Sequence, residues 1–236
     1  MPQLLSSKNL LLSSRPLTVG VVSQPDALAA LLGQTAAERA AACDLFELRL
    51  DLLKLDAAEM RKAIPALGLP VLLTARHPAE GGQGSEDAAG RRALLEPLLD
   101  LAALIDIELR SVIDFRDLLP RARGLGVGVI GSFHDFQATP GDDILQGAMD
   151  MAQTAGFDAF KLATYLNGPE DLIRLMKLVA GHRRLPVSVM GMGALGRVSR
   201  LTLAKLGSLL NYGYLGESNA PGQWPAALLK DLLAEL

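Results

Sequence analysis

Short apolar runs alternate with longer amphipathic segments from residue 17 to the C-terminus. Eight of these runs are rich in Leu, Val, Ile or Ala and end near turn residues, which predicts strands over 17–23, 45–50, 71–76, 103–109, 127–134, 159–165, 187–190 and 212–216. Helical periodicity predicts helices over 25–42, 86–101, 142–155, 170–180, 199–210 and 224–236. Strands that alternate with helices in this way indicate parallel βα units. The pattern therefore favours an α/β fold with one domain, the (β/α)8 TIM barrel, over residues 17–236.

An open doubly wound sheet is the main rival fold. It would need a glycine-rich phosphate fingerprint after its first strand, and the segment Gly-Val-Val-Ser-Gln-Pro at 20–25 has no such glycine series. Residues 1–16 precede the first predicted strand, and their apolar run at 10–12 is too short for a secretory signal. We expect these residues to form an N-terminal leader of low order.

Composition narrows the class of protein and its partners. The 236 residues are 50% hydrophobic and 21% charged, which is typical of a soluble globular chain. The net charge of −3 gives no basic surface, so we expect no nucleic-acid partner. No apolar stretch approaches the roughly 20 residues of a membrane span. The one cysteine, Cys43, rules out an internal disulfide and suits a reducing compartment. A cytoplasmic protein without a membrane partner is the expectation.

Polar residues gather where the predicted strands end. In TIM barrels the catalytic residues lie at the C-terminal ends of the strands. Nearly every predicted strand carries or precedes an ionisable or amide group: Glu47, Arg49, Asp51, Arg76, Glu80, Asp106, Glu108, His134, Asp135, Lys161, Arg200 and Gln223. Strand alternation would place Glu47, Arg49 and Asp51 on one face, where an ion-pair layer inside the barrel is the alternative to a binding role. This density of charge predicts a polar site at one mouth.

Lys161 lies within the otherwise apolar run 157–165. Burial disfavours the charged ammonium group, and a neutral amine can condense with a ketone to form a Schiff base. The alternative is a strand lysine that is ion-paired or that extends to solvent.

His134 ends the apolar run 127–133, on the strand before the one that carries Lys161. Neighbouring strands lie about 4.8 Å apart, so the imidazole and the amine could act on adjacent atoms of one substrate, with His134 as general acid and base. A structural, hydrogen-bonded histidine is the alternative. His77 and His182 fall in a loop and at a helix end, where we expect surface roles. No histidine, cysteine or carboxylate pair has zinc-ligand spacing, so we expect no metal.

Two glycine-rich segments follow predicted strands. The segment 78–84 lacks the lysine of a P-loop and is better interpreted as a mobile loop that closes over a ligand. The segment 190–196, followed by Ser199 and Arg200, could bind phosphate at a helix start or bind a carboxylate through the arginine.

Taken together, these motifs resemble type I 3-dehydroquinate dehydratase. The matching segments are Glu47-Leu-Arg49-Leu-Asp51, Thr74-Ala-Arg76 with Glu80-Gly-Gly, Asp106-Ile-Glu108, Ser132-Phe-His134-Asp135-Phe136, Lys161-Leu-Ala163, Gly193 to Arg200, and Ala220-Pro-Gly-Gln223. They follow the order of the family and extend from about residue 17 to the end of the chain. The combination of Ser-aromatic-His-Asp-Phe with the following strand lysine is specific, whereas each motif alone is weak.

The resemblance implies a barrel like that of the class I aldolases and a lyase of the shikimate pathway, part of aromatic amino acid biosynthesis. Such an enzyme converts 3-dehydroquinate to 3-dehydroshikimate by syn elimination of water, without metal or organic cofactor. By match to the motifs, Lys161 forms the Schiff base with the C3 ketone. His134 removes the C2 proton and protonates the departing C1 hydroxyl, and Glu80 orients His134. The family often forms dimers, so a homodimer is possible.

By the same resemblance, Arg200 binds the substrate carboxylate, while Glu47, Arg49, Arg76 and Gln223 reach the ring hydroxyls or support the groups that do. One position departs from the family, which usually has Ser-Ala-Pro-Gly-Gln near its end. This chain has Asn219 before Ala220, with Ser218 one place earlier. Because the Asn219 amide can still donate a hydrogen bond to substrate, we expect altered affinity or loop closure and not lost chemistry.

Two other functions remain open from the sequence. A Schiff-base aldolase on the same barrel would share the lysine, but it would favour a phosphate site and would not need the pairing of His134 with Glu80. A catalytically silent barrel that binds metabolites is the third possibility, because Asn219 replaces the family serine.

Overall fold

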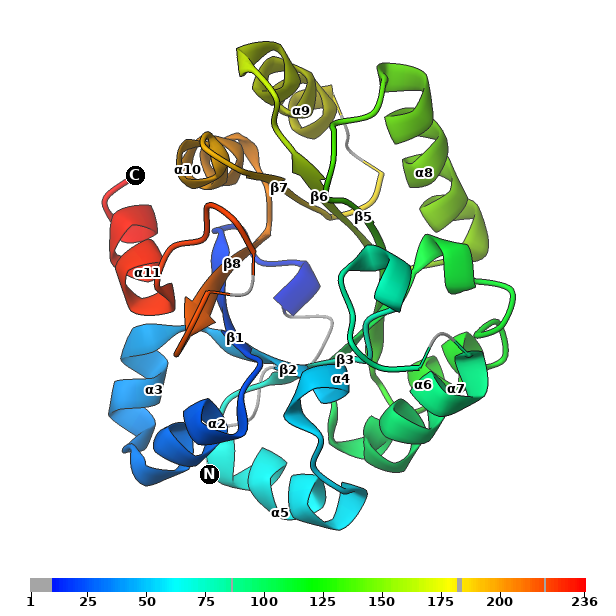
Figure 1. Ribbon diagram of the computed structural model, residues 1–236, viewed down its shortest axis with the longest axis vertical. Coiled ribbons are helices and arrows are strands. Elements are labelled where there is room, and N and C mark those ends of the chain that lie inside the picture. The colour runs from blue at the N-terminus through cyan, green and yellow to red at the C-terminus, as the bar shows by residue number, and fades with distance from the viewer. Residues whose placement is uncertain (1–9, 86, 182–183, 219) are drawn as a thin grey trace.

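The computed structural model describes residues 10–85, 87–181, 184–218 and 220–236, and its eight parallel strands surround a common axis (Figure 1). The strands are β1 (Leu17–Val22), β2 (Leu45–Arg49), β3 (Val71–Thr74), β4 (Leu104–Glu108), β5 (Gly128–Asp135), β6 (Ala159–Tyr165), β7 (Val187–Met192) and β8 (Leu210–Leu215). The α-helices are α2 (Pro25–Gly33), α3 (Ala36–Ala42), α4 (Leu50–Leu53), α5 (Ala57–Leu67), α6 (Ala88–Leu95), α7 (Leu118–Gly124), α8 (Asp142–Ala155), α9 (Pro169–Gly181), α10 (Gly196–Leu206) and α11 (Ala226–Ala234). Three 3-10 helices are η1 (Pro78–Glu80), η2 (Glu96–Leu101) and η3 (Leu109–Ser111).

The sheet runs in the order β7-β6-β5-β4-β3-β2-β1-β8, and each neighbouring pair is parallel. β7 and β8 meet at a seam that brings the two edges together. There the Leu209 N–H donates to the Val187 carbonyl at 2.8 Å. The hydroxyls of Ser188 and Ser208 accept from the N–H groups of Leu210 and Val189, at 3.0 and 2.9 Å. These contacts nearly close the barrel, so the predicted TIM fold is confirmed.

All eight predicted strands are present, and β6 spans the predicted residues 159–165. The helix expected over 25–42 is two helices, because Thr35 and Glu38 form a capping box that starts α3. The helix expected over 86–101 changes to the 3-10 helix η2, which has a proline in its first turn. The helix expected over 199–210 ends at Leu206, since β8 already begins at Leu210.

The apolar core has two parts. One lies between the strands and the surrounding helices, and the other fills the lower barrel interior with side chains such as Leu45, Leu104 and Ile130. Leu10 and Leu11 of the predicted leader are buried against this interior part, while residues 1–9 lie outside the described residues. Toward the C-terminal ends of the strands the interior becomes polar, which creates the setting for a site.

Among the helices that the structure describes, none is long and apolar enough to cross a membrane.

Candidate active site

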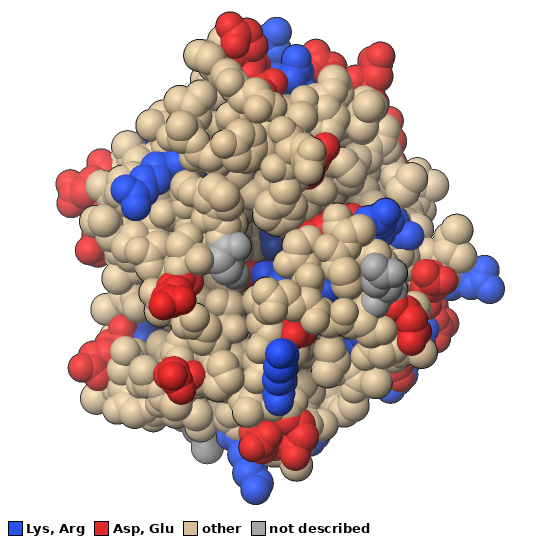
Figure 2. Space-filling model, viewed as in Figure 1, with Lys and Arg blue, Asp and Glu red and all other residues tan. Residues whose placement is uncertain are grey.

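A cavity opens at the C-terminal ends of the strands, the face on which TIM barrels carry their active sites. Figure 2 shows a hollow in the middle of the face in view, with lysine or arginine atoms at its bottom. The lining residues are Val21, Glu47, Arg49, Arg76, Glu80, Gly81, His134, Phe136, Lys161, Ala163, Met190, Met192, Arg200, Tyr212, Ala220 and Gln223. Every described residue for which the sequence predicted a catalytic or substrate-binding role therefore contributes to one cavity.

Lys161 projects into the cavity from the middle of β6 and is 4% exposed. Its Nζ lies 3.2 Å from Glu47 Oε1 and 3.0 Å from Asp106 Oδ2, and 4.0 Å from the centre of the Tyr212 ring. The expected burial is present, but the expected apolar surroundings are not. The amine is therefore both buried and ion-paired.

Asp106 is the more firmly held of these two carboxylates. It accepts hydrogen bonds from both Nη atoms of Arg76, at 2.9 and 2.8 Å, and from the Ser132 hydroxyl at 2.5 Å. Burial alone would raise the pKa of Asp106, but the charges of Arg76 and Lys161 outweigh it and hold the pKa well below its usual range. Asp106 is therefore a permanent anion beneath the amine.

His134 lies one step nearer the mouth than Lys161. In the register of β5 and β6, Ser132 is opposite Lys161 and His134 is opposite Ala163. The ring Nδ1 is 2.9 Å from Glu80 Oε2, and the backbone N–H of His134 donates to the same oxygen at 3.0 Å. Nε2 has no hydrogen-bond partner in the described part of the chain. The carboxylate thus fixes the ring and leaves Nε2 for a ligand.

The protonation of this pair suits a base. Burial raises the pKa of Glu80 to about 7, with Arg76 opposing the rise and Glu108 adding to it. Burial, together with the positive charges of Arg76 and Lys161, lowers the pKa of His134 well below its ordinary value. The imidazole is therefore neutral at neutral pH and can accept a proton at Nε2.

The loop that carries Glu80 is a tight turn. Gly81 has a φ of +85°, and a Cβ at Gly82 would collide with the carbonyl oxygen of Arg76. Glycine is needed at both positions, because the loop turns back against β3 and brings the Glu80 carboxylate beneath His134. Closure of this segment over a ligand stays a prediction.

Arg200, on α10, is 1% exposed and lines the cavity. It donates from Nε to the Gly222 carbonyl at 3.3 Å and from Nη1 to the Tyr212 carbonyl at 3.1 Å. No carboxylate pairs with it among the described residues, and burial lowers its pKa to about 10. A buried cation without a counterion is suited to bind an anionic group of a ligand.

Arg49 and Arg76 are engaged with protein groups. Arg49 forms a two-point ion pair with Asp51, at 3.0 and 2.8 Å, and also donates to the Gly81 carbonyl. Asp51 was expected on the strand, but β2 ends at Arg49 and Asp51 lies in the first turn of α4. Arg76 bonds to Asp106 and, at 2.9 Å, to Glu108. Both arginines line the cavity, yet much of their hydrogen-bonding capacity is taken up.

The segment after β8 supplies Gln223, which is buried and lines the cavity. The Ser218 hydroxyl donates to Gln223 Oε1 at 3.3 Å and to the Ala220 carbonyl at 2.9 Å.

The predicted substrate-binding residue Asn219 lies outside the described residues, as does His182. His77 caps η1 by accepting from the Ala79 N–H, so its ring has a structural contact. Within the described ranges, no group of three or more potential metal ligands is present.

Comparison with known proteins identifies the family. The family model of type I 3-dehydroquinase matches residues 22–236, which is most of the chain. The chain belongs to the type I 3-dehydroquinase family.

Relatives named 3-dehydroquinate dehydratase agree with this assignment. The protein of Methanosarcina barkeri is 36% identical over 203 residues, covering 80% of this chain and 84% of the relative. The protein of Pyrobaculum aerophilum is 37% identical over 185 residues, covering 76% of this chain but 59% of the relative. This chain thus spans little more than half of the Pyrobaculum protein. Family membership makes it an enzyme of the hydro-lyase class, as the motifs predicted.

Solved structures give the same result for the fold. The 3-dehydroquinate dehydratase of Geobacillus kaustophilus superposes with a TM-score of 0.86 at 26% identity, covering 100% of this chain and 96% of that one. The enzyme of Aquifex aeolicus gives a TM-score of 0.82 at 27% identity, covering 93% and 98%. The barrel is therefore that of the type I 3-dehydroquinases.

Some residues that line the cavity or contact Lys161 were not predicted from the sequence. Asp106 was noted at a strand end but was given no role, and Tyr212 was treated only as the start of a predicted strand. Tyr212 lies two residues after Leu210 on β8, so alternation puts both side chains on the interior face. Val21, Met190 and Met192 are apolar residues within strands, and nothing in the sequence around them indicates that they line the cavity.

Proposed function

We propose that this chain dehydrates 3-dehydroquinate to 3-dehydroshikimate by syn elimination through a Schiff base on Lys161. One observation supports the proposal above others. A single cavity is lined by a buried amine, by an imidazole with a bound carboxylate, and by a buried guanidinium that has no carboxylate partner in the described chain. These three groups match the ketone, the acidic C–H bond and the carboxylate of the substrate.

Binding begins with the substrate carboxylate at Arg200. A charge-assisted, two-point contact would satisfy the buried guanidinium and fix one end of the ring. Glu47, Arg49, Arg76 and Gln223 surround the remaining space and offer hydrogen-bonding groups to the ring hydroxyls. An anionic polyol needs such directed contacts, because the apolar wall of Val21, Met190 and Met192 cannot orient it.

Imine formation follows at the C3 ketone. The Lys161 ammonium first gives up a proton to a neighbouring group, and its nitrogen then attacks C3 to form a carbinolamine. Loss of the former ketone oxygen as water leaves a protonated imine. Asp106 stays ionised beneath the new cation and stabilises it, because Arg76 and Ser132 hold this carboxylate in place.

Elimination then uses His134 twice. Nε2 removes the C2 proton, and the electron pair of the C–H bond moves toward the iminium nitrogen to give an enamine. The imidazolium next donates that proton to the C1 hydroxyl, which leaves as water while the enamine electrons form the new C1–C2 double bond. One base on one face of the ring gives syn stereochemistry. Glu80 stabilises the transient imidazolium through its 2.9 Å contact with Nδ1.

Hydrolysis of the imine releases the product and restores Lys161. No step calls for a metal or an organic cofactor. We also place the enzyme in the shikimate pathway of aromatic amino acid biosynthesis and in the cytoplasm.

A homodimer is a further part of this proposal. Exposed apolar side chains of Ile113, Ile144 and Met151 line one groove beside the mouth, and burial in a second copy would remove this surface from water. Sedimentation equilibrium checks it. A single species with the 25.0 kDa mass of one chain at micromolar concentration would contradict the dimer.

The proposed reaction is tested by adding 3-dehydroquinate and following ultraviolet absorbance, because dehydration creates a conjugated enone. In parallel, borohydride reduction in the presence of ligand should add the ligand mass at Lys161. Lys161→Ala should lose both signals, and Lys62→Ala, at an exposed lysine of α5, should keep both. His134→Ala should still be labelled at Lys161 but should not turn over. Labelling of the Lys161→Ala variant would refute the Schiff base.

A further inference from the structure

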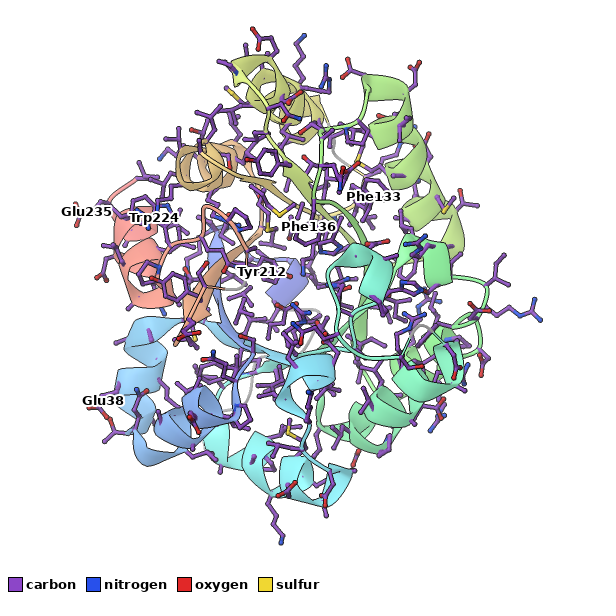
Figure 3. All side chains as sticks on the ribbon, viewed as in Figure 1. Glu38, Phe133, Phe136, Tyr212, Trp224 and Glu235 are labelled. Atoms are coloured by element: carbon purple, nitrogen blue, oxygen red, sulfur yellow. The ribbon has the colours of Figure 1, made fainter. Side chains whose placement is uncertain are left out.

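The Tyr212 hydroxyl is a polar group buried inside the barrel. Tyr212 lies on β8, opposite Val19 of β1, and is 2% exposed. Its Oη has no hydrogen-bond partner among the described residues. Figure 3 shows the residue near the middle of the barrel. Burying an unsatisfied hydroxyl destabilises a fold, and phenylalanine would fill nearly the same space without that cost. The hydroxyl therefore calls for an explanation beyond packing.

The position of Tyr212 relative to the nucleophile suggests one. Lys161 Nζ lies over the Tyr212 ring, 4.0 Å from its centre, and both side chains line the cavity. The ring face stabilises the ammonium and would equally stabilise the protonated imine that replaces it. The hydroxyl sits at the edge of that same ring. A carbon atom bonded to Nζ, and an oxygen on that carbon, would come close to the ring edge.

We propose that the Tyr212 hydroxyl donates a hydrogen bond to the oxygen of the ketone carbon that Lys161 attacks. This inference rests on the proposed Schiff-base function and adds to it a group that promotes carbon–nitrogen bond formation. As the amine nitrogen bonds to the carbon, the π electrons of the carbonyl move to its oxygen. The oxygen takes one proton from the attacking amine nitrogen to become the carbinolamine hydroxyl, and it leaves as water with the proton that the Lys161 ammonium first gave to the neighbouring group. Tyr212 stabilises the growing negative charge on that oxygen and keeps its own proton throughout.

The surroundings of Tyr212 favour a donor over a base. Burial and the nearby carboxylates of Glu47 and Asp106 raise the pKa of its hydroxyl well above the ordinary value, and Arg76 opposes them only in part. The phenol therefore stays protonated across the pH range in which His134 and Glu80 change state. The donor has no partner before substrate arrives, so its hydrogen bond is made only in the complex, where it contributes to rate.

The test compares Tyr212→Phe with the wild type. The substitution keeps the ring and its contact with the amine and removes only the oxygen. Tyr214→Phe, two positions along β8 and outside the residues that line the cavity, makes the same chemical change and is the control. The measured quantities are the borohydride-trapping rate of Lys161 with 3-dehydroquinate in a single turnover, kcat and KM at steady state, and the thermal midpoint of the free enzyme.

For Tyr212→Phe we expect imine trapping and kcat/KM to fall by about 100- to 1000-fold, the usual cost of one lost donor at a developing oxyanion. The thermal midpoint should be unchanged or higher, because an unsatisfied hydroxyl has been removed. Tyr214→Phe should trap at the wild-type rate.

Two results would overturn the inference. One is equal trapping and equal kcat/KM in Tyr212→Phe and wild type. The other is a lowered thermal midpoint with a normal trapping rate, which would mean that the hydroxyl serves the fold. If the wild type itself gives no adduct at Lys161, the proposed function fails and this inference fails with it. The wild-type arm therefore separates the two failures.

Discussion

Arg76 and Arg200 both line the cavity with buried guanidinium groups, and in the strand order they lie on opposite sides of Lys161. They differ in whether carboxylates surround the guanidinium group. Arg76, beyond β3, bonds to two carboxylates and a serine hydroxyl. Arg200, beyond β7, bonds only to backbone carbonyls among the described residues. The carboxylates outweigh burial and raise the pKa of Arg76, whereas burial lowers that of Arg200 to about 10.

The contrast separates support from binding. On the β2–β5 side the charges are already satisfied, and Glu108 accepts from Arg91 as well as from Arg76. A substrate anion on that side would have to displace a carboxylate that is already in place. On the β7–β8 side the cation has no counterion in the described chain, so an incoming carboxylate gains a full charge-assisted contact. We propose that the first side holds the catalytic groups in position and that the second receives the substrate.

Arg76→Met should give the largest change in stability. It removes the cation and leaves Asp106 and Glu108 buried close together, so we expect the free energy of unfolding to fall by about 3–5 kcal/mol. Urea denaturation measures this. Arg61→Met removes an arginine from an exposed pair with Asp100 and should leave stability nearly unchanged. Similar losses in both variants would show that the buried network contributes no more than a surface pair.

Arg200→Met should have the opposite effect, with a large loss of kcat/KM and a small loss of stability. We expect kcat/KM for 3-dehydroquinate to fall by about 100- to 1000-fold, mainly through KM, because the substrate carboxylate loses its partner. The free energy of unfolding should fall by no more than about 1 kcal/mol, since the lost bonds are two contacts to carbonyls and an unpaired buried charge is removed as well. Steady-state kinetics and urea denaturation of the same preparation check both parts. A stability loss as large as that of Arg76→Met would end the distinction between the two sides.

The two sides also differ in what the sequence could predict. Parallel strands are buried on both faces, so their apolar runs were visible, and every strand was found near its true position. Charged residues at strand ends were predicted to meet, because the barrel brings those ends together. Which of them pair was not predictable. The partner of Arg76 depends on the register between β3, β4 and β5. The partner of Asp51 depends on the helical turn α4, which is too short to leave a periodic pattern in the sequence.

Lys161 was expected among apolar side chains because its neighbours along the strand are apolar. Its actual neighbours come from β2 and β4, across the barrel.

Glu80→Gln tests the pair that lies between the two sides. In the wild type, kcat/KM should rise with pH through about 7, as the His134–Glu80 pair loses its extra proton and the imidazole becomes a free base beside a carboxylate. In the variant, the remaining proton belongs to His134, whose pKa is lowered by burial and by Arg76 and Lys161. The rise should therefore move to lower pH, while the plateau falls by about 10- to 100-fold because the imidazolium loses its counterion.

The pH profile of Glu217→Gln serves as the control, because it removes an exposed carboxylate that does not line the cavity. An unmoved rise near pH 7 in Glu80→Gln would assign the titration to another group.

Ser208→Ala gives the smallest expected effect and tests what stabilises the β7–β8 side, where Arg200 has no ion pair among the described residues. The Ser208 hydroxyl accepts from the Val189 N–H at 2.9 Å and donates to the Val189 carbonyl at 3.1 Å, so it joins β8 to β7 at the seam. Its loss leaves a buried N–H without a partner and should lower the free energy of unfolding by about 1–2 kcal/mol.

Ser199→Ala removes a second buried hydroxyl that is bonded to β7, and it should lower the free energy of unfolding by a similar amount. Neither change removes a group from the cavity, so imine trapping at saturating substrate should stay within about twofold of wild type, a difference of less than about 0.5 kcal/mol. A loss near that of Arg76→Met would mean that hydrogen bonds at the seam stabilise the barrel as strongly as the buried ion pairs do.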